Sequence, residues 1–184
     1  MITRSDYETA QRRAAAILRK TGVRLREYEL ARISVADFGL GELPVSGAQI
    51  LTLLDTEEIA VKMIVLFPGQ TLPEHRHPPL GEYPGKAETL RCEWGTAYLY
   101  TPGAPTSDPQ AKVPEHRHNS YTVWNEHILH PGDQITLPPN QLHWFQGGPQ
   151  SAVVWSFSSR AVDTEDIFTD PDIERETIII DDGP

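Results

Sequence analysis

The strongest constraint on the fold is a series of short segments, rich in β-branched and aromatic residues, that fills the chain after Gly41. Glycines and prolines separate these segments, and no helical period lies between them. Short strands joined by turns are typical of an all-β sandwich or barrel. Four prolines make Thr101–Pro114 a loop, because proline cannot donate to a strand ladder. The predicted strands are Gln49–Leu54, Val61–Phe67, Thr89–Tyr100, Tyr121–Leu129, Gln134–Leu137 and Ala152–Ser158.

The region before these strands has the pattern of helices. We expect Ser5 to cap the first helix, because Glu8 completes a capping box three residues later, and Gly22 to end it. A second, shorter helix is predicted at Arg26–Ile33. The apolar face of the first helix, which should pack against the barrel, consists of Tyr7, Ala10, Ala14 and Ile17.

The length of 184 residues suits one domain with its own core. We expect a single domain over 1–184, with no linker. Its parts are an N-terminal helical segment (1–36) packed on the barrel, the barrel itself (37–171) and a C-terminal tail (172–184). Within the tail, Thr177–Ile180 is a candidate edge strand or dimer contact.

Composition narrows the partners and the location. The net charge of −10 argues against a nucleic-acid partner, because phosphate binding needs a cationic face. A single cysteine, Cys92, permits no internal disulfide and suits a reducing compartment. Neither a signal peptide nor an apolar run of about 18 residues is present. We therefore expect a cytoplasmic protein that makes no membrane contact.

Three histidines and one glutamate have the spacing of a metal site. On a strand, His75 and His77 lie on the same face, because side chains alternate with a period of two. Glu88 begins a strongly β segment, and His143 follows a turn that starts at Gly132. Three imidazoles with one carboxylate suit Mn, Fe, Co, Ni or Zn better than Ca or Mg. Such a set can leave coordination positions free for a substrate.

These two stretches resemble the motifs of the cupin superfamily. The resemblance implies a cupin fold, a double-stranded β-helix or jelly-roll barrel, here with a short N-terminal helical segment. Asn140 replaces a motif glycine, and ten residues rather than three or four separate His77 from Glu88. The longer spacer predicts an inserted loop, Pro78–Gly85, at the mouth of the site. The matching residues are Gly69, His75, His77, Glu88 and Gly95 in the first motif and Gly132, Pro138 and His143 in the second.

The sequence Pro-Glu-His-Arg-His occurs a second time, at Pro114–His118. This copy lies in the proline-rich loop and has no glutamate at a matching distance. We interpret it as a surface or rim element rather than a second metal site. His127 and His130 lack partners in the sequence and are expected to be exposed or hydrogen-bonded.

Longer segments are similar to the bacterial D-lyxose isomerases, in order from Asp37 to Pro171. The resemblance implies a dimeric, manganese-dependent enzyme that interconverts D-lyxose with D-xylulose, and often D-mannose with D-fructose. It also implies that Lys86, two residues before the glutamate ligand, acts on a sugar oxygen. The matching segments are Asp37–Gly41, Leu66–Pro79, Gly85–Thr89, Tyr121–Glu126, Leu137–Gln146 and Asp166–Pro171.

The chain departs from this family at one position. The family carries a glutamate, thought to be the catalytic base, where this sequence has Ser156. A serine hydroxyl has far too high a pKa to act as a free base. The candidates for that role are Glu82 in the inserted loop, Glu93, and Lys86 if its pKa is lowered. Trp144 and Phe145, next to the last ligand, could pack against the sugar ring or fill the core, and the alternation of side chains indicates that only one of them faces inward.

Three functions remain open from the sequence. The leading hypothesis is a metal-dependent aldose–ketose isomerase acting on unphosphorylated pentoses or hexoses, since no glycine-rich cradle or arginine cluster accompanies the ligands. An iron-dependent oxygenase would use the same four ligands. A sugar-binding protein without turnover is the third, because Ser156 replaces the glutamate.

Overall fold

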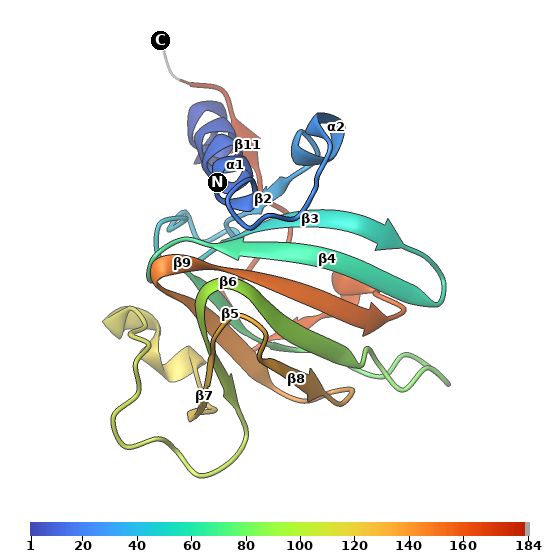
Figure 1. Cartoon of the computed structure of the whole chain (residues 1–184). Coiled ribbons are helices and arrows are strands. Elements are labelled where there is room, and N and C mark those ends of the chain that lie inside the picture. The colour runs from blue at the N-terminus through green and yellow to red at the C-terminus, as the bar shows by residue number, and fades with distance from the viewer. Residues whose placement is uncertain (183–184) are drawn as a thin grey trace.

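The computed structural model describes residues 1–182 and contains two α-helices, two 3-10 helices and eleven strands (Figure 1). The helices are α1 (Arg4–Leu18), α2 (Glu27–Leu30), η1 (Glu115–Ser120) and η2 (Asp163–Glu165). The strands are β1 (Ile2–Thr3), β2 (Ser34–Ala36), β3 (Ala48–Asp55), β4 (Ile59–Leu66), β5 (Thr71–Arg76), β6 (Glu88–Thr101), β7 (Asn125–Leu129), β8 (Gln134–Leu137), β9 (His143–Ser159), β10 (Ile167–Phe168) and β11 (Ile179–Ile180).

One nine-stranded sheet forms the body of the molecule, and it curls around two long strands. Strand β9 pairs with β5 near its start, with β4 near its end and with β6 along most of its length. Strand β6 also pairs with β8 at its start and with β7 at its end. The sheet thereby encloses an apolar interior, which confirms the predicted cupin fold.

The two long strands change partners at a bulge. The register between β6 and β9 shifts twice around Gly95, which has a φ of 75°. A Cβ atom at Gly95 would lie 2.1 Å from the carbonyl oxygen of Ser151, so only glycine fits this crossing. The bend turns both strands and so brings the start of β6 toward the histidine strands.

Helix α1 covers the outer face of β3 and β4, as Figure 1 shows. Its buried residues form a core layer separate from the barrel interior. The predicted helix is confirmed, but Ser5 lies inside its first turn and the N-cap is Thr3, whose hydroxyl accepts a hydrogen bond from the Asp6 backbone. The second predicted helix is confirmed as the single turn of α2.

The predicted strands are confirmed with one correction. Within the predicted strand Tyr121–Leu129, only Asn125–Leu129 forms β7. Tyr121 and Trp124 instead surround the buried Trp144, so their aromatic character reflects a side-chain cluster and not a strand. Residues His143–Gln146, not predicted as a strand, form the first part of β9.

The chain beyond β9, residues 160–182, crosses back over the open end of the barrel and is called the C-terminal segment below. Strand β10 in this segment pairs with β5, the strand that carries His75. The segment then passes Asp37 and ends as β11, which pairs in parallel with β1. The predicted edge strand at Thr177–Ile180 is thus confirmed for Ile179 and Ile180.

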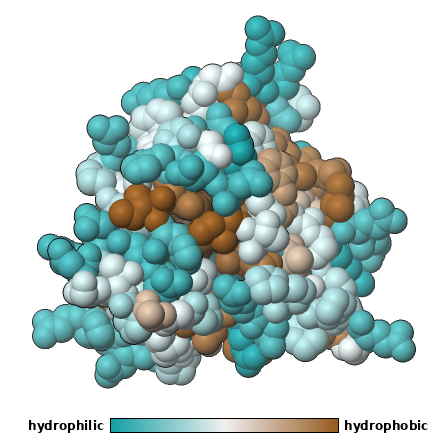
Figure 2. Space-filling model, turned by 60° about the horizontal axis from the view of Figure 1, so that its bottom comes forward, coloured by the Kyte–Doolittle hydropathy of each residue, from teal (hydrophilic) through white to brown (hydrophobic). Residues whose placement is uncertain are grey.

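The described residues include no helix long and apolar enough to span a membrane. On the face shown in Figure 2, hydrophobic side chains form separate patches among hydrophilic ones.

Candidate metal and sugar site

Three imidazoles meet where β5 pairs with β9. His75 lies near the end of β5, His77 directly follows it, and His143 begins the neighbouring strand β9. The pairing of β5 with β9 puts His75 opposite His143. One ring nitrogen from each of the three buried histidines lies within 4.8 Å of the others, so the group can hold a metal ion.

Hydrogen bonds on the outer side of each ring fix the orientation of the imidazoles. The Nδ1 atoms of His75 and His143 lie 2.8 and 3.0 Å from the carbonyl oxygens of Pro73 and Gln141. A carbonyl can only accept, so Nδ1 carries the hydrogen and the Nε2 lone pair faces inward. The Nδ1 atom of His77 lies 2.6 Å from a carboxylate oxygen of Asp166. This arrangement, with Nδ1 donating outward, is typical of histidines that bind metals.

Glu88, the first residue of β6, completes the group. Its Oε2 atom lies 3.2 Å from Nε2 of His77 and 3.5 Å from Nε2 of His143. Its other oxygen accepts hydrogen bonds from Ser156 and from Lys86. Burial alone would raise the pKa of Glu88, but the Lys86 ammonium and the two imidazoles hold it well below its usual range. Glu88 is therefore ionised and available as a ligand.

The group has the chemistry of a metal centre. Burial, together with the imidazoles of His143 and His77, lowers the pKa of His75 well below its usual value, so this ring is neutral at pH 7. Within residues 1–182 the buried Nε2 atom of His143 has no hydrogen-bond partner. A buried polar atom without a partner is costly, and a cation among the Nε2 atoms and Glu88 would satisfy it.

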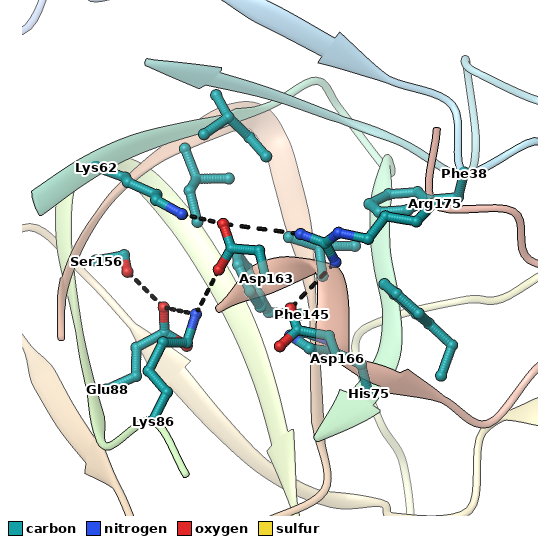
Figure 3. A pocket seen from close by; sticks show the side chains of 14 residues that line it. Phe38, Lys62, His75, Lys86, Glu88, Phe145, Ser156, Asp163, Asp166 and Arg175 are labelled. Carbon is teal, nitrogen blue, oxygen red and sulfur yellow. Dashed lines mark hydrogen bonds and ion pairs between the residues drawn. The ribbon is translucent and has the colours of Figure 1, made fainter. Parts of the chain in front are cut away.

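A cavity opens beside His75 and Glu88, lined by aliphatic and aromatic side chains on its walls and by charged groups on one side (Figure 3). The walls include Ile50, Ile64, Leu72 and Phe145, which come from strands β3, β4, β5 and β9. The space between these side chains amounts to about 460 Å³ when the open solvent at the mouth of the pocket is included. A cavity with apolar walls and a few convergent polar groups is typical of a small-molecule site.

The charged side of the cavity is a chain of ion pairs. Asp163 contacts Lys62, lies 3.4 Å from Lys86 and 3.7 Å from Arg175, and Figure 3 shows it between the three cations. Arg175 also lies 3.1 Å from Asp166, the residue that orients His77. The C-terminal segment thus contributes two carboxylates and one guanidinium to the cavity.

The structure separates the residues that the sequence nominated for catalysis. Lys86 and Ser156 line the cavity beside Glu88, whereas the exposed side chain of Glu82 lies outside its lining. Glu93 also lies outside, where it accepts a hydrogen bond from the indole of Trp155. The condition for Lys86 to act as a base, a lowered pKa, is not met: burial favours a lower pKa, but Glu88, Asp163 and Asp166 outweigh it and raise the pKa.

Two further predictions concern the rim of the cavity. The lining contains no residue of the predicted mouth loop Pro78–Gly85, and the C-terminal segment takes that place. Of the two aromatic residues after His143, Phe145 faces the cavity and Trp144 packs on Tyr100. The difference follows from the alternation of side chains along β9.

The second His-Arg-His lies on η1, outside the cavity. His116 is largely exposed and hydrogen-bonds to Glu42, and His118 stacks on Trp124. Arg117, between them, forms ion pairs with Glu42 and with Asp170 of the C-terminal segment. This copy of the motif therefore joins surface elements.

Sequence reasoning missed four charged residues of the cavity. In the sequence, Lys62 looks like an ordinary residue of a strand. Its burial depends on its ion pair with Asp163 of the C-terminal segment. Asp163, Asp166 and Arg175 lie in an acidic tail that has no motif spacing. The one available signal was the segment Asp166–Pro171, which resembles the isomerases as closely as the metal motifs do.

Comparison with known proteins identifies relatives over nearly the whole chain. A "D-lyxose ketol-isomerase" of Cohnella laeviribosi is 49% identical over 175 residues, covering 95% of this chain and 96% of the relative. One of the same name from Thermofilum sp. is 47% identical, covering 95% and 97%. A "D-lyxose/D-mannose isomerase" of Thermosediminibacter oceani is 46% identical, covering 95% and 97%. No family model matches the chain.

Solved structures agree on the fold. An Acinetobacter sp. L-ribose isomerase variant in complex with L-ribose superimposes with a TM-score of 0.81 at 18% identity, covering 97% of this chain and 98% of that chain. A Cellulomonas parahominis L-ribose isomerase gives a TM-score of 0.79 at 17% identity with the same coverage. At such identities the likeness establishes the fold, whereas the relatives at 46–49% identity establish the family. The chain belongs to the D-lyxose ketol-isomerases, a family of aldose–ketose isomerases with a cupin fold.

Proposed function

We propose that the protein interconverts D-lyxose with D-xylulose, and D-mannose with D-fructose, at a divalent metal held by His75, His77, Glu88 and His143. Mn²⁺ is the proposed ion, and Co²⁺, Fe²⁺, Ni²⁺ and Zn²⁺ suit the same nitrogen and oxygen donors. The names of the relatives support the sugars. We also propose a single-domain, cytoplasmic homodimer.

One observation carries the proposal: three inward-facing Nε2 atoms and an ionised carboxylate meet beside a cavity that His75 and Glu88 line. A metal at this point would act as a Lewis acid toward the oxygens on C1 and C2 of an open-chain sugar. In His75 and His143 the hydrogen lies on Nδ1, so these two rings can bind an ion through Nε2 without first losing a proton.

The remaining residues prepare the site around that ion. Ser156 and Lys86 both bond Oε1 of Glu88 and leave Oε2 toward the imidazoles. Lys86 stays an ammonium because its pKa is raised, so it can donate to a sugar oxygen that becomes negative during the reaction. Phe145 and the aliphatic walls keep water from the reacting carbons.

The charges of the cavity favour a free sugar over a sugar phosphate. Lys62, Lys86 and Arg175 are each paired with a carboxylate. A phosphate would have to displace one of these partners, whereas hydroxyl groups can donate to the carboxylates and accept from the cations. This supports unphosphorylated pentoses and hexoses as substrates.

The test is an anaerobic assay of the Mn²⁺-loaded protein with D-lyxose and with D-mannose, with the ketoses detected as products. We expect turnover that a chelator abolishes and that added Mn²⁺ restores. His75→Ala should lower kcat/KM by at least about a thousandfold, because it removes a metal ligand. His130→Ala, at an exposed histidine outside the cavity, is the matched control and should leave kcat/KM unchanged.

Two other results would overturn the proposal. A requirement for iron and oxygen uptake would indicate an oxygenase at the same ligands. Sugar binding by calorimetry without any ketose formation would indicate a binding protein.

A further inference from the structure

The cavity is lined by three carboxylates, and two of them are already engaged with the imidazoles. Glu88 lies against His77 and His143, and Asp166 orients His77 from its outer side. Asp163 contacts none of these rings in the described hydrogen bonds and ion pairs. An aldose–ketose isomerisation needs a group that moves a proton between neighbouring carbons. Among the carboxylates of the cavity, Asp163 is the one left for this task.

The position of Asp163 suits a group that meets substrate. It begins η2, the turn that immediately brings the chain back over the cavity after β9. Its side chain keeps 29% of its surface exposed, against 5% for Glu88 and 8% for Asp166. Figure 3 shows the carboxylate in the middle of the charged side of the cavity, on the same side as Lys86.

Lys62 holds this carboxylate in place. It lies on β4 directly opposite Ser156 of β9, and only 8% of the residue is exposed. A buried lysine needs a partner, and Asp163 is the partner that Lys62 has within residues 1–182. Arg175 and Lys86 approach the same carboxylate from two other sides. The orientation of Asp163 is therefore fixed by a residue of β4, by the residue two positions before β6 and by a residue of the C-terminal segment.

We propose that Asp163 is the general base that carries the proton between C2 and C1 of the sugar, with Lys62 as its positioning residue. This inference rests on the proposed isomerase function and adds the identity of its base. It assigns the proton transfer to the C-terminal segment, because β9 presents only the Ser156 hydroxyl at the cavity.

The proton transfer balances within the substrate. Asp163 takes the proton from C2 of the open-chain aldose, and the electron pair of that C–H bond forms the C1–C2 double bond. The carbonyl electrons of C1 move to O1, where Lys86 donates a hydrogen bond to the new negative charge. Asp163 then returns the proton to C1, while the O2 hydroxyl loses its proton to O1 and C2 becomes the carbonyl carbon. C2 is oxidised, C1 is reduced, and no other reactant is needed.

Asp163 has the protonation state that this step requires. Burial would raise its pKa, but Lys86, Lys62 and Arg175 outweigh burial and lower the value to about 2. The side chain is therefore ionised at neutral pH and able to accept a proton. Lys86 forms ion pairs with both Asp163 and Glu88. A sugar oxygen that accepts a hydrogen bond from Lys86 weakens the ion pair between Lys86 and Asp163. The carboxylate of Asp163 then becomes a stronger proton acceptor.

The experiment compares Asp163→Asn with Glu165→Gln, an exposed residue on the same turn, in the Mn²⁺-loaded enzyme. We expect Asp163→Asn to lower kcat by about 10² to 10⁴, the usual range for removing a general base. KM should change only a few-fold and the bound metal should stay equal to that of the wild type. Uptake of deuterium from solvent into the sugar should fall together with kcat. Glu165→Gln should match the wild type.

Two further variants separate chemistry from folding. Asp163→Glu keeps the charge and the ion pairs, so it should fold like the wild type, yet its kcat should fall by at least about tenfold because the carboxylate is displaced by one methylene. Lys62→Gln should lower kcat with little change in KM and move the acidic limb of the pH–rate profile to higher pH, since one cation beside Asp163 is lost. Lys62→Arg should restore that limb.

The outcomes distinguish this inference from the function on which it rests. If the wild type isomerises D-lyxose and Asp163→Asn retains kcat within a few-fold, the inference is overturned and the proposed function stands. An increase in KM with unchanged kcat would also overturn it, and would make Asp163 a sugar anchor. A wild type without isomerase activity would overturn the proposed function and this inference together.

Discussion

At the scale of single residues, the site depends on groups that orient the proposed metal ligands. Asp166 binds the outer nitrogen of His77, and Ser156 donates to the oxygen of Glu88 that points away from the imidazoles. Burial would lower the pKa of His77, but Asp166 and Glu88 outweigh burial and raise it. These two carboxylates therefore favour a positive charge at the ring of His77.

Asp166→Asn should weaken metal binding by about 10- to 100-fold, the usual effect of losing a carboxylate behind a histidine ligand. The amide removes the charge that supports the ring but keeps the size of the side chain. Dissociation constants for Mn²⁺, measured by competition with a fluorescent chelator, would check this. Asp172→Asn, at a largely exposed aspartate of the same segment, is the control. Equal affinities of the two variants would contradict the expectation.

Ser156→Ala should change the proposed metal site without destroying it. The hydroxyl is buried and its loss removes one hydrogen bond from Glu88, which costs about 1–3 kcal/mol because the acceptor is charged. Lys86 still contacts the same oxygen, so the carboxylate stays ionised. We expect a lower melting temperature and metal affinity weakened by no more than about tenfold. Complete loss of metal would show that the hydroxyl has a larger part in the site.

At the scale of elements, buried polar contacts help to close the open end of the barrel. Glu74 of β5 is 1% exposed and accepts hydrogen bonds from Thr122 and Val123 backbone groups and from the hydroxyls of Thr122 and Thr169. It therefore joins a histidine strand to the connection before β7 and to the C-terminal segment.

Glu74→Ala should destabilise the fold by about 3 kcal/mol, because buried donors are left without an acceptor. For a chain of this size that corresponds to a fall in Tm of roughly 6–12 °C. Glu74→Gln should cost less, since the two threonine hydroxyls can rotate to accept from the amide. Thermal unfolding by circular dichroism would order the three proteins. A Glu74→Ala variant as stable as the wild type would contradict this account.

Gly95→Ala tests the bend of β6 and β9. The added methyl group would lie 2.1 Å from a carbonyl oxygen, at a backbone φ of 75°, so the two strands must separate. We expect a loss of more than about 3 kcal/mol in the free energy of unfolding. Gly132→Ala, at a φ of 99° with no atom within 4 Å, carries only the backbone strain and should cost about 1 kcal/mol. Denaturant unfolding of both variants would measure these two losses, and equal losses would contradict the close contact at Gly95.

The elements also show where sequence reasoning succeeds. Gln134–Leu137 was predicted to the residue, because a short β-branched run lies between Gly132 and Pro138. The start of β9 was missed, because Gly147, Gly148 and Pro149 look like a turn, although the strand continues through them. In the site, motif spacing identified the four residues that meet at the imidazoles. The ion-pair partners of Asp163 could not be predicted from the sequence, because they meet only where the chain reverses after β9, and no local pattern indicates that reversal.

At the scale of the whole molecule, three carboxylates with lowered pKa values form ion pairs between distant parts of the chain. Asp37 holds the Met1 ammonium, Glu42 holds Arg117 of η1, and Asp163 holds Lys62 across the cavity. In each case burial favours a higher pKa, but the cation and hydrogen-bond partners outweigh it and lower the pKa. The folded state then binds fewer protons than the unfolded chain at acidic pH, so stability must fall as the pH falls.

The expected acid sensitivity has a defined window. Unfolded carboxyl groups have pKa values of about 4, and Asp163 reaches about 2 in the folded state, so its contribution is present above pH 4 and is lost between about pH 4 and 2. The urea midpoint should therefore decrease over this range. Asp163→Asn should flatten the decrease, because its side chain does not titrate. Parallel curves for the two proteins would contradict the linkage.

Trp144 follows His143 on β9, is fully buried and stacks on Tyr100 with 3.9 Å between ring centres. The indole is thus one peptide bond away from a proposed ligand and shielded from water. We expect an open-shell transition ion at the proposed site to quench part of the indole emission, which three other tryptophans share. Titration of the protein with such an ion would then report occupancy of the three histidines without any sugar present.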